Sequence, residues 1–537
     1  MMTTMRMTRL LCYLLTVLLV VCTFAACADE APDIKDPTQN DEASGDEKPD
    51  DEKPGPDEPG PDEPGPDEPG PNDPGPDEPE EPEIPDYLLQ VPQENYGGAP
   101  IVILCREDKK YEIDIDAESG ALVEKAVFDR NARVEEYLDV EIASYPVNGS
   151  WPLRDEFIAV LNSAVATTDN SFQIVATHSS YNAGLALGDQ YYNLLPLSDS
   201  IRLDAPWWSS SWVENATIHD NLFHITGDVS LTMWEELYAV FFNRGMVNDR
   251  QEEIGDLYQI VWDDEWTLEN MAILSDIYED SNGDDAKNIG DTFGLVINRH
   301  AMRAFVTSCA LPIAALNEDG GYDLVFMDED HAEKVETVYT LLYRLIYENE
   351  GTFDSLLTDG DYTEMLDIFT SDGSLFMTGT LNNSSALRHA EMQFGILPFP
   401  KYDIDQDTYL SHSYDGLSSF SIPACATEPK MSAHVLDALG AESKHEVIPA
   451  YYEVVLQGRV AQDAESKEML NIIRENLFFD FGFIYSDALK GPGTSAGPFG
   501  FFGDKLREGK ESLSSSWASV CDVYATKLES IMEKFSQ

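Results

Sequence analysis

The feature that most constrains this chain is an interrupted apolar stretch, residues 221–248, near the middle of the sequence. An apolar segment at 222–226 breaks at the polar residues 227–230, and apolar sequence resumes at 237–242. Short apolar runs with turn signals at both ends are typical of buried strands. We interpret this stretch as a crossing between two α/β lobes, with the loop that carries Trp234 lining the space between them, because ligand sites favour such interfaces. A strand-loop-strand unit inside one core is the alternative.

Upstream of this stretch the sequence alternates between strand and helix patterns. Apolar runs predict three strands, and amphipathic periodicity predicts a helix in each gap between them. The strands are expected at 99–105, 140–143 and 172–176, and the helices at 119–137 and 153–167. The order strand, helix, strand, helix, strand is the doubly wound α/β pattern, in which ligand-facing loops follow the carboxyl ends of the strands.

Downstream of the crossing the same kinds of pattern continue. Strands or extended returns are predicted at 374–379, 394–402 and 419–423, and helices at 266–277, 432–439, 447–456 and 465–476. We therefore predict an α/β fold in the form of a two-lobed clamshell with crossing hinge strands, like that of periplasmic binding proteins. Lobe 1 is expected to comprise residues 96–225 with 394–440, and lobe 2 residues 226–393 with 441–537.

The N-terminus carries an export signal, expected at residues 1–27. Arg6 and Arg9 precede an apolar segment at 10–21, which has the length of a signal sequence and is short for a membrane span. The segment ends in Phe-Ala-Ala-Cys, which resembles the lipobox of bacterial lipoproteins with Phe24 in place of the usual Leu. Cys27 is therefore predicted to be the lipidated first residue of a membrane-anchored protein, with plain secretion as the alternative.

Residues 28–95 are predicted to be a disordered stalk. The sequence PGPDE recurs here, and 24 acidic residues face three lysines between Asp29 and Asp86. Such a segment has little apolar surface to bury, and its like charges repel one another. Proline-rich acidic sequence favours extended conformations, so the stalk would hold a folded head away from a membrane.

The composition and the missing motifs limit the ligands and reactions that are expected for the folded part of the chain, the head. The chain has a formal net charge of −67, which disfavours binding to nucleic acid or to anionic lipid. None of the common hydrolase, metalloprotease, nucleotide-binding or dinucleotide-binding motifs is present, so we expect no enzyme and no required cofactor. Cys105, Cys309, Cys425 and Cys521 lack metal-site spacing, and isolated buried thiols are expected, although Cys105 and Cys425 could be neighbours.

Several segments resemble the extracellular solute-binding proteins of ABC importers, in the carbohydrate-binding branch. They are the lipobox, NARVEEYLDVEI at 131–142, the crossing at 222–247, WTLE at 266–269, SLFMTG at 374–379, FGILPFPKYD at 394–403, and the stretch at 442–473. The resemblance covers roughly residues 97–490. It implies that two lobes close on a ligand. It also implies that the protein is a monomer and that its protein partners are the permease subunits of the importer. It does not identify the ligand.

Sugars present hydroxyl groups and apolar C–H faces, so their sites combine aromatic plates with carboxylates and amides. The predicted loops supply both kinds of group, although any single aromatic side chain can instead belong to the core. The predicted ligand-binding residues are Tyr181, Asn182, Asp228, Trp234, Trp266, Asn382, Tyr414 and Asp415. Trp266 has a specific alternative, since it precedes Thr267, a plausible N-cap with Asn270 at the third helical position.

An acidic loop has the spacing of a twelve-residue calcium site. Oxygen donors stand at positions 1, 3, 5, 9 and 12, namely Asp280, Asn282, Asp284, Asn288 and Asp291. Position 6, usually glycine, is Asp285. A structural calcium ion is the prediction, and a solvated acidic turn is the alternative.

These observations predict an extracytoplasmic, lipid-anchored subunit of an ABC importer that captures a neutral oligosaccharide by lobe closure. A surface adhesin or accessory protein that holds glycan without transport is a second hypothesis, and a surface glycosidase is a third. The sequence specifies neither the sugar nor whether a peptide replaces it.

Overall fold

The structure is a computed structural model that describes residues 84–115, 120–355, 362–387, 390–456 and 464–536. The signal, Cys27 and most of the predicted stalk lie outside these residues, and the described residues belong to one compact unit. Within it the 3₁₀ turn η1 (Leu88–Gln90) precedes the predicted end of the stalk at residue 95. Leu88 and Val91 are buried, and the Tyr137 hydroxyl donates to the Val91 carbonyl at 2.8 Å. These contacts join residues 88–91, which the sequence analysis assigned to the disordered stalk, to the compact unit.

The first sheet has four strands in the order β12-β3-β1-β2. The strands β1 (Ala99–Arg106), β2 (Val140–Val147) and β3 (Ile174–His178) are parallel, and β12 (Ser418–Ser421) is antiparallel to β3. All three parallel strands overlap the predicted ones, although β2 continues to Val147 and β3 begins only at Ile174. Strand β12, which follows in the chain only after the second sheet, closes one edge.

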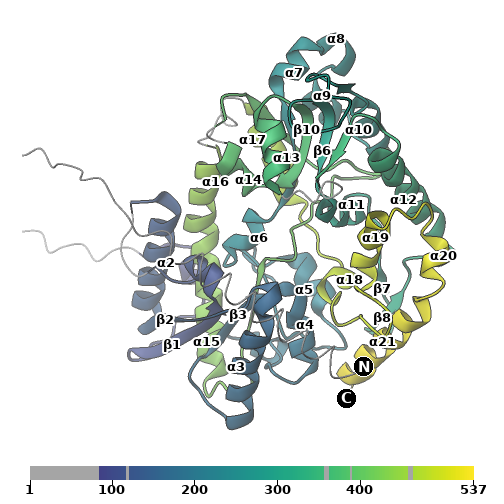
Figure 1. The fold of residues 1–537 in the computed structure, drawn as a ribbon. Helices are drawn as coiled ribbons and strands as arrows, with labels where there is room; N and C mark the ends of the chain where they lie inside the picture. The colour runs from purple at the N-terminus through teal and green to yellow at the C-terminus, as the bar shows by residue number, and fades with distance from the viewer. Residues whose placement is uncertain (1–83, 116–119, 356–361, 388–389, 457–463, 537) are drawn as a thin grey trace, which may run out of the picture. The chain divides into compact units, whose positions relative to one another are not determined.

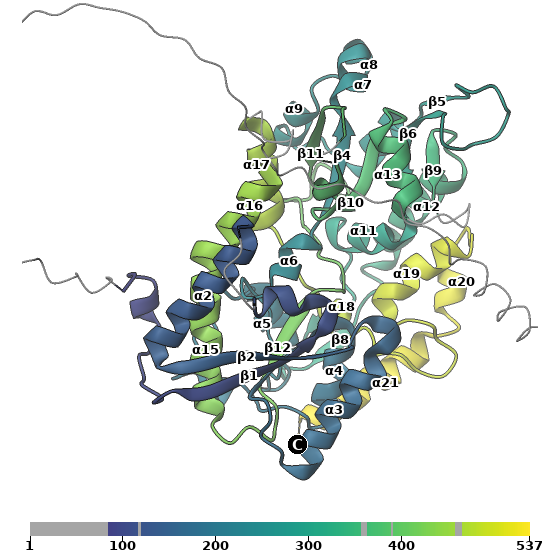
Figure 2. The ribbon, with the colours of Figure 1, turned by 60° about the vertical axis from the view of Figure 1, so that its left-hand side comes forward.

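Helices cover both faces of this sheet (Figures 1 and 2). The helices are α2 (Leu122–Leu138), α3 (Arg154–Thr167), α4 (Ser179–Leu187) and α15 (Pro429–Glu442). Along β1, Ile101 and Ile103 belong to the core shared with α2, whereas Leu104 packs in a second core with Phe157 of α3 and Tyr181 of α4. Burial on both faces is typical of central parallel strands and explains the nearly continuous apolar sequence of β1 and the start of β3, whereas β2, at the edge of the sheet, is mostly exposed or half-buried.

The second sheet is mixed and has the order β11-β4-β10-β6-β5, with β9 also paired to β6. Its strands are β4 (Tyr238–Asn243), β5 (Tyr278–Glu279), β6 (Thr292–Ile297), β9 (Thr352–Asp354), β10 (Ser374–Thr380) and β11 (Phe394–Leu397). The pairs β10–β6 and β6–β9 are parallel, and the other pairs are antiparallel. The sequence analysis placed residues 394–440 with the first lobe, but β11 pairs with β4, because its four buried residues complete the edge of the second sheet.

Helices accompany the second sheet as well. They are α7 (Arg244–Asp249), α8 (Gln251–Ile254), α9 (Leu257–Trp262), α10 (Leu268–Leu274), α11 (Met302–Ser308), α12 (Ala332–Tyr347), α13 (Tyr362–Thr370), α14 (Asn383–Leu387) and α17 (Ala464–Glu475). Of these, α13 packs on β10 and β6, α12 contacts β9, and α17 packs on β11. No helix in the described residues is both long and apolar enough to cross a membrane.

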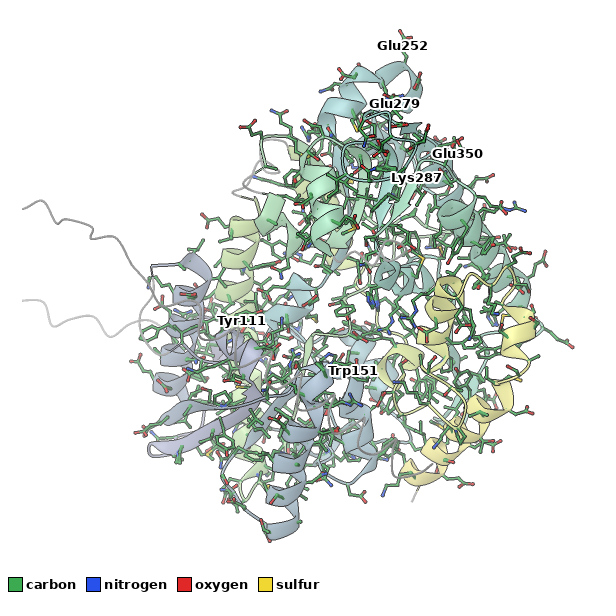
Figure 3. The ribbon with its side chains drawn as sticks, viewed as in Figure 1. Tyr111, Trp151, Glu252, Glu279, Lys287 and Glu350 are labelled. Carbon is green, nitrogen blue, oxygen red and sulfur yellow. The ribbon has the colours of Figure 1, made fainter. Side chains whose placement is uncertain are left out.

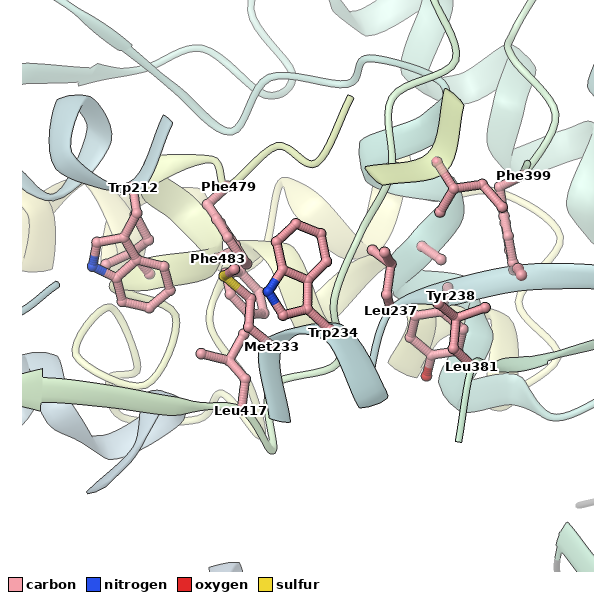
Figure 4. Close-up of a cluster of buried hydrophobic side chains, with 14 of the residues drawn as sticks. Trp212, Met233, Trp234, Leu237, Tyr238, Leu381, Phe399, Leu417, Phe479 and Phe483 are labelled. Carbon is pink, nitrogen blue, oxygen red and sulfur yellow. The ribbon is translucent and has the colours of Figure 1, made fainter. Parts of the chain in front are cut away.

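Three connections in the described residues carry the chain between the two sheets before the C-terminal helices begin. It runs from β3 to β4 through α5 (Ser210–Ala216) and α6 (Leu231–Glu235), and it returns from β11 to β12 through residues 398–417. The third passage is a long helix in which α15 continues through a π-helical turn, Ser443–Val447, into α16 (Ile448–Leu456). Figure 4 shows the apolar side chains packed around the first two passages, among them Trp212, Trp234 and Phe399.

The predicted crossing is therefore only partly regular structure. Strand β4 confirms the apolar run at 237–242. Residues 222–226 form no strand, and Ile225 instead makes a single two-bond bridge to Phe420 of β12, at 2.9 and 2.7 Å. Trp234 lies in the short helix α6 rather than in a loop, because the Ser230 side chain accepts a hydrogen bond from Met233 N and caps this helix.

The C-terminal residues contact both halves of the unit. Their helices are α18 (Phe481–Ile484), α19 (Pro498–Arg507), α20 (Ser514–Trp517) and α21 (Cys521–Phe535). Helix α18 packs on α4 and α5, α19 packs on α11 and α12, and α21 packs on the hairpin of β7 (Ala314–Leu316) and β8 (Tyr322–Leu324). The four cysteines of the described residues are free thiols, and Cys521 alone among them is not fully buried.

Candidate functional site between the two sheets

In each sheet, the carboxyl ends of the parallel strands lie on the side that faces the other sheet. In the first sheet, the carboxyl ends of β1 and β3 lie beside the start of β12, since Ser418 pairs with His178. In the second sheet, the ends of β6 and β10 lie beside the start of β4, since Thr380 pairs with Tyr238. Ligands of open α/β sheets bind outside these ends. The polar side chains there are called the inter-sheet cluster, and they are Lys109, Tyr111, Trp151, His178, Glu235, Glu236, His300, Arg303, Asn382, Tyr414 and Asp415.

Contacts within the cluster join the two sheets. The Tyr111 hydroxyl, beyond the end of β1, donates a hydrogen bond to the Glu235 carboxylate, just before β4. Lys109 Nζ lies 3.6 Å from Glu236 Oε1. The main-chain N–H groups of Asn382 and Tyr414 donate to the carbonyls of Glu235 and Glu236, both at 2.9 Å. Glu235 and Glu236 therefore lie between the two sheets, and groups from both sheets contact them.

A second ion pair connects the sheets farther along the junction. Arg303 Nη1 of α11 pairs with Asp415 Oδ2, three residues before β12, and both side chains are about one-quarter exposed. The Ser179 hydroxyl donates to the Asp415 carbonyl at 2.8 Å. Tyr414, next to this pair, has its ring 6.4 Å from those of both Tyr238 and His300. The cluster therefore combines charged donors and acceptors with partly exposed aromatic surface.

The cluster also has aromatic surface at the end of β3. Trp151, which is 37% exposed, lies 5.9 Å from the His178 ring, and the cations of Arg154 and Lys490 lie over its indole at 4.4 and 5.0 Å. Figure 3 labels Trp151 and Tyr111 on the first-sheet side of the junction. An exposed indole near directed polar groups is the combination that sugar sites require.

The protonation states in the cluster follow from burial. Burial raises the pKa of Glu235 to about 7, against the lowering effect of the Tyr111 hydrogen bond. Burial, with help from Arg106, lowers the pKa of His178 to about 3, and burial also lowers the pKa of His300, so both imidazoles are neutral at pH 7. Burial alone would raise the pKa of Asp415, but Arg303 holds it below its ordinary value.

A cavity of about 530 Å³ lies elsewhere along the crossings. Its walls include Trp207, Trp208, Asp228, Trp234 and Lys444. Trp234 Nε1 donates to Asp228 Oδ1 at 3.1 Å, and Lys444 Nζ lies 3.6 Å from Asp228 Oδ2. Burial raises the pKa of Asp228 to about 6, and Lys444 opposes that rise. The cavity and the inter-sheet cluster have no residue in common.

The structure divides the eight predicted ligand residues into three groups. Asn382, Tyr414 and Asp415 belong to the inter-sheet cluster, whereas Asp228 and Trp234 line the cavity. The remaining three are Tyr181, Asn182 and Trp266, all buried. Because the structure separates these groups, one ligand cannot touch all eight.

The three buried residues are parts of the protein interior. The Tyr181 hydroxyl donates to Gly149 O at 2.8 Å, and Asn182 Nδ2 donates to Ser419 Oγ at 2.8 Å. Trp266 Nε1 donates to Pro398 O at 2.8 Å. Thr267 caps α10 by accepting from Asn270 N at 3.2 Å, so the alternative interpretation of Trp266 is confirmed. The prediction had placed Tyr181 and Asn182 in a loop after β3, but helix α4 starts there immediately and turns them inward.

Sequence reasoning missed the largest part of the cluster. Lys109 and Tyr111 follow the first predicted strand directly, so the rule that ligand-facing loops follow strand ends could have found them. Glu235 and Glu236 precede β4, and no local signal distinguishes them among 100 acidic residues. Arg303 follows β6, a strand that the sequence analysis did not predict.

The predicted calcium ligands, Asp280, Asn282, Asp284, Asn288 and Asp291, all lie in one loop between β5 and β6. Among the described residues, no three side chains of His, Cys, Asp or Glu form a preassembled metal centre. The loop carboxylates instead accept main-chain N–H groups, as Asp280 does from Gly283 at 2.6 Å and Asp285 at 3.1 Å. Calcium binding stays a prediction.

The chain aligns with solved structures of proteins in complex with sugars. A cyclo/maltodextrin-binding protein complexed with maltotetraose aligns with a TM-score of 0.50 at 9% identity, over 82% of this chain and 97% of that one. The ABC substrate-binding protein Lmo0181 from Listeria monocytogenes, in complex with cycloalternan, aligns with a TM-score of 0.48 at 10% identity, over 82% and 99%. No family model and no curated protein matches the chain. The chain therefore has the two-lobed α/β fold of the cyclo/maltodextrin-binding protein.

Proposed function

We propose that this protein captures a neutral oligosaccharide at the inter-sheet cluster and presents it to the permease subunits of an ABC importer. The observation that carries the proposal is the convergence of strand ends from two sheets on carboxylates, cations and exposed aromatic rings. Carboxylates accept hydrogen bonds from sugar hydroxyls, and aromatic rings stack on sugar C–H faces. The solved proteins of similar fold, which bind maltotetraose and cycloalternan, support the same class of ligand.

The mechanism is binding without chemistry. Each sheet contributes part of the cluster, so a ligand that contacts both parts favours the closed arrangement of the lobes. Paired charges such as Lys109 with Glu236 balance each other locally, which suits an uncharged ligand in an otherwise acidic protein. Closure would remove water from these groups and strengthen their hydrogen bonds.

The location follows from the N-terminal sequence. We propose that Cys27 is lipidated and holds the protein at the outer face of the cell membrane, with the acidic proline-rich stalk as spacer. Replacing Cys27 by Ser should release the protein from the membrane fraction into the medium. Continued membrane association of the Ser variant would contradict the lipid anchor.

Two lysines provide a matched test of the ligand site. Lys109 in the cluster and Lys444 in the cavity each lie 3.6 Å from a carboxylate. If the cluster holds the ligand, Lys109→Met should weaken oligosaccharide binding by about tenfold or more, and Lys444→Met should leave it unchanged, since hydrogen bonds to charged groups contribute about 1.5–3 kcal/mol. Calorimetry with di- to tetrasaccharides measures both. If Lys444→Met weakened binding and Lys109→Met did not, the ligand would bind in the cavity and not at the cluster.

The ligand series also separates import from adhesion. An importer subunit should bind short oligosaccharides with one site per chain. Binding to long or insoluble polymer without binding to short chains would favour the alternative of a surface adhesin or accessory protein. Release of reducing ends during long incubation would instead indicate a glycosidase.

A further inference from the structure

The loop between β5 and β6 is built from hydrogen-bonded turns around the residues with calcium-loop spacing, although its carboxylates are not gathered into a metal centre in this structure. Asp280 at position 1 accepts hydrogen bonds from three successive N–H groups, those of residues 283, 284 and 285. Asn282 at position 3 accepts from Asp284 N at 2.9 Å, and Asp284 at position 5 accepts from Ala286 N at 2.9 Å. In these turns a side-chain oxygen accepts an N–H two to five residues ahead, and twelve-residue calcium loops place acidic residues at the same positions.

The sequence departs from the calcium pattern at position 6, and the structure shows how the turn is made without glycine. Asp285 has φ of +60°, in the left-handed region that this position needs. Aspartate tolerates this region better than most residues other than glycine. The sharp turn is therefore present despite the substitution.

A buried carboxylate lies beneath the loop. Asp291 at position 12 is 2% exposed, and its Oδ2 accepts from Asn288 N at 3.1 Å, so the carboxylate is directed at the loop. Its Oδ1 is buried and forms no hydrogen bond of good geometry among the described residues, although the Tyr278 side chain interacts with this carboxylate. A buried carboxylate oxygen without a well-aligned donor is costly, and a bound cation is one way to satisfy it.

The amide of Asn288 marks where a cation would lie. Its Nδ2 donates both to Asp284 Oδ2 and to the Ala286 carbonyl, each at 2.9 Å. These acceptors stand at positions 5 and 7, where calcium loops use a carboxylate and a main-chain carbonyl. Lys287 does not compete for this place, because its Nζ donates to the Glu350 carbonyl at 2.6 Å; Figure 3 labels both residues.

We propose that this loop binds one calcium ion. The ligands are the carboxylates of Asp280, Asp284 and Asp291, the side-chain oxygen of Asn282 and the Ala286 carbonyl, with Asn288 turning its Oδ1 inward or holding a water. Oxygen ligands in a flexible loop suit calcium rather than magnesium, which demands a tighter octahedral site. An affinity of about 10⁻⁴–10⁻³ M is expected for an extracellular loop.

The ion would fix the outer part of the second sheet. The loop joins β5 to β6, and Figure 2 shows it projecting beside β5. Strand β6 begins next to Asp291 and ends shortly before Arg303, a member of the inter-sheet cluster. Calcium should therefore stabilise the strand that carries one wall of the site without contacting the sugar.

The test compares calcium with magnesium on the full chain after treatment with a chelator. Calorimetry should show one saturable calcium ion per chain, and calcium should raise the melting temperature by about 2–5 °C, beyond any effect of magnesium at equal ionic strength. An equal effect of magnesium, or calcium uptake without saturation, would identify diffuse attraction to an acidic chain and overturn the proposal.

Three variants remove one charge each from the same loop. Asp291→Asn and Asp284→Asn change proposed ligands and should weaken calcium binding at least tenfold. Asp285→Asn removes the same charge at position 6, which supplies no ligand, and asparagine also accepts positive φ, so its calcium affinity should stay within threefold. Asp284 is exposed, so that variant reports on binding even if Asp291→Asn fails to fold. Equal losses in Asp285→Asn and Asp284→Asn would refute a specific site.

Discussion

Arg303 and Asp415 form an ion pair that joins α11, beside the second sheet, to the segment that leads into the first. We predict that Asp415→Asn lowers oligosaccharide affinity at least tenfold, because Arg303 would keep its charge at the site without its counter-charge. Charged pairs of this kind change binding by about 2–5 kcal/mol when one partner is removed. Titration calorimetry gives the affinity.

The control for this pair is Asp129→Asn, which breaks the exposed pair of Lys125 and Asp129 at 2.6 Å on α2. It should leave affinity unchanged, since exposed pairs contribute at most about 1 kcal/mol. The pKa of Asp415 is lowered in the folded protein, so its contribution to stability is present at neutral pH and is lost only as the pH falls through the folded pKa, below the ordinary 3.8. A loss of the Asp415 effect between pH 5 and 8 would contradict this assignment.

Glu235 predicts a pH dependence of the opposite sign. Its pKa is raised from 4.5 to about 7, so the folded state holds a proton that the unfolded state releases, and stability falls as the pH rises from 4.5 to 7. Glutamine cannot titrate, so in Glu235→Gln the free energy of unfolding should fall by on the order of 1 kcal/mol less over this pH range. This value allows for the partial solvent exposure of Glu235. Denaturant unfolding at pH 5 and pH 8 measures the difference, and an unchanged pH slope in the variant would count against it.

Trp266 tests the assignment of a predicted ligand residue to the core. Trp266→Ala should destabilise the protein by about 3–5 kcal/mol, because it removes a fully buried indole and its hydrogen bond to Pro398 O. Oligosaccharide affinity, measured below the melting temperature, should stay within threefold. A large loss of affinity in a folded variant would return Trp266 to the ligand site.

Gly227 predicts a steric effect at the first crossing. A Cβ atom there would lie 2.1 Å from the Trp207 carbonyl oxygen, so Gly227→Ala should destabilise the protein by about 1–3 kcal/mol through displacement of the backbone. Gly184→Ala is the matched control, because a Cβ in helix α4 meets nothing within 4 Å and alanine favours helix. Thermal unfolding of both variants should show opposite signs.

The three parallel strands of the first sheet were predictable because an amphipathic helix separates each of them from the next. The strands β1, β2 and β3 needed only local periodicity. The position of β11 was not predictable in this way, since its sequence fits the edge of either sheet and its pairing with β4 is a long-range choice. The local sequence pattern predicts that a segment is a strand, but it does not predict which strand pairs with it.

The site was predicted less well than the fold, for a related reason. Tyr181 and Tyr414 both follow or precede a strand in polar sequence, yet the first is buried under Gly149 and the second is partly exposed at the junction. The pair Arg303–Asp415 spans 112 residues of sequence, so no spacing rule could reveal it. Composition indicated acidic and aromatic groups, and only the tertiary arrangement decided which of them face a ligand.

The long helix that passes between the sheets contains five residues, Ser443–Val447, in π-helical conformation. A π turn accommodates one residue more than an α turn, and each residue of an α-helix rotates the direction of its successors by about 100°. This single extra residue therefore sets which way α16 points its side chains. Excising one residue from the turn would swing Tyr451 and Tyr452, both buried, out of their present packing, although every amino acid needed for the helix would still be there.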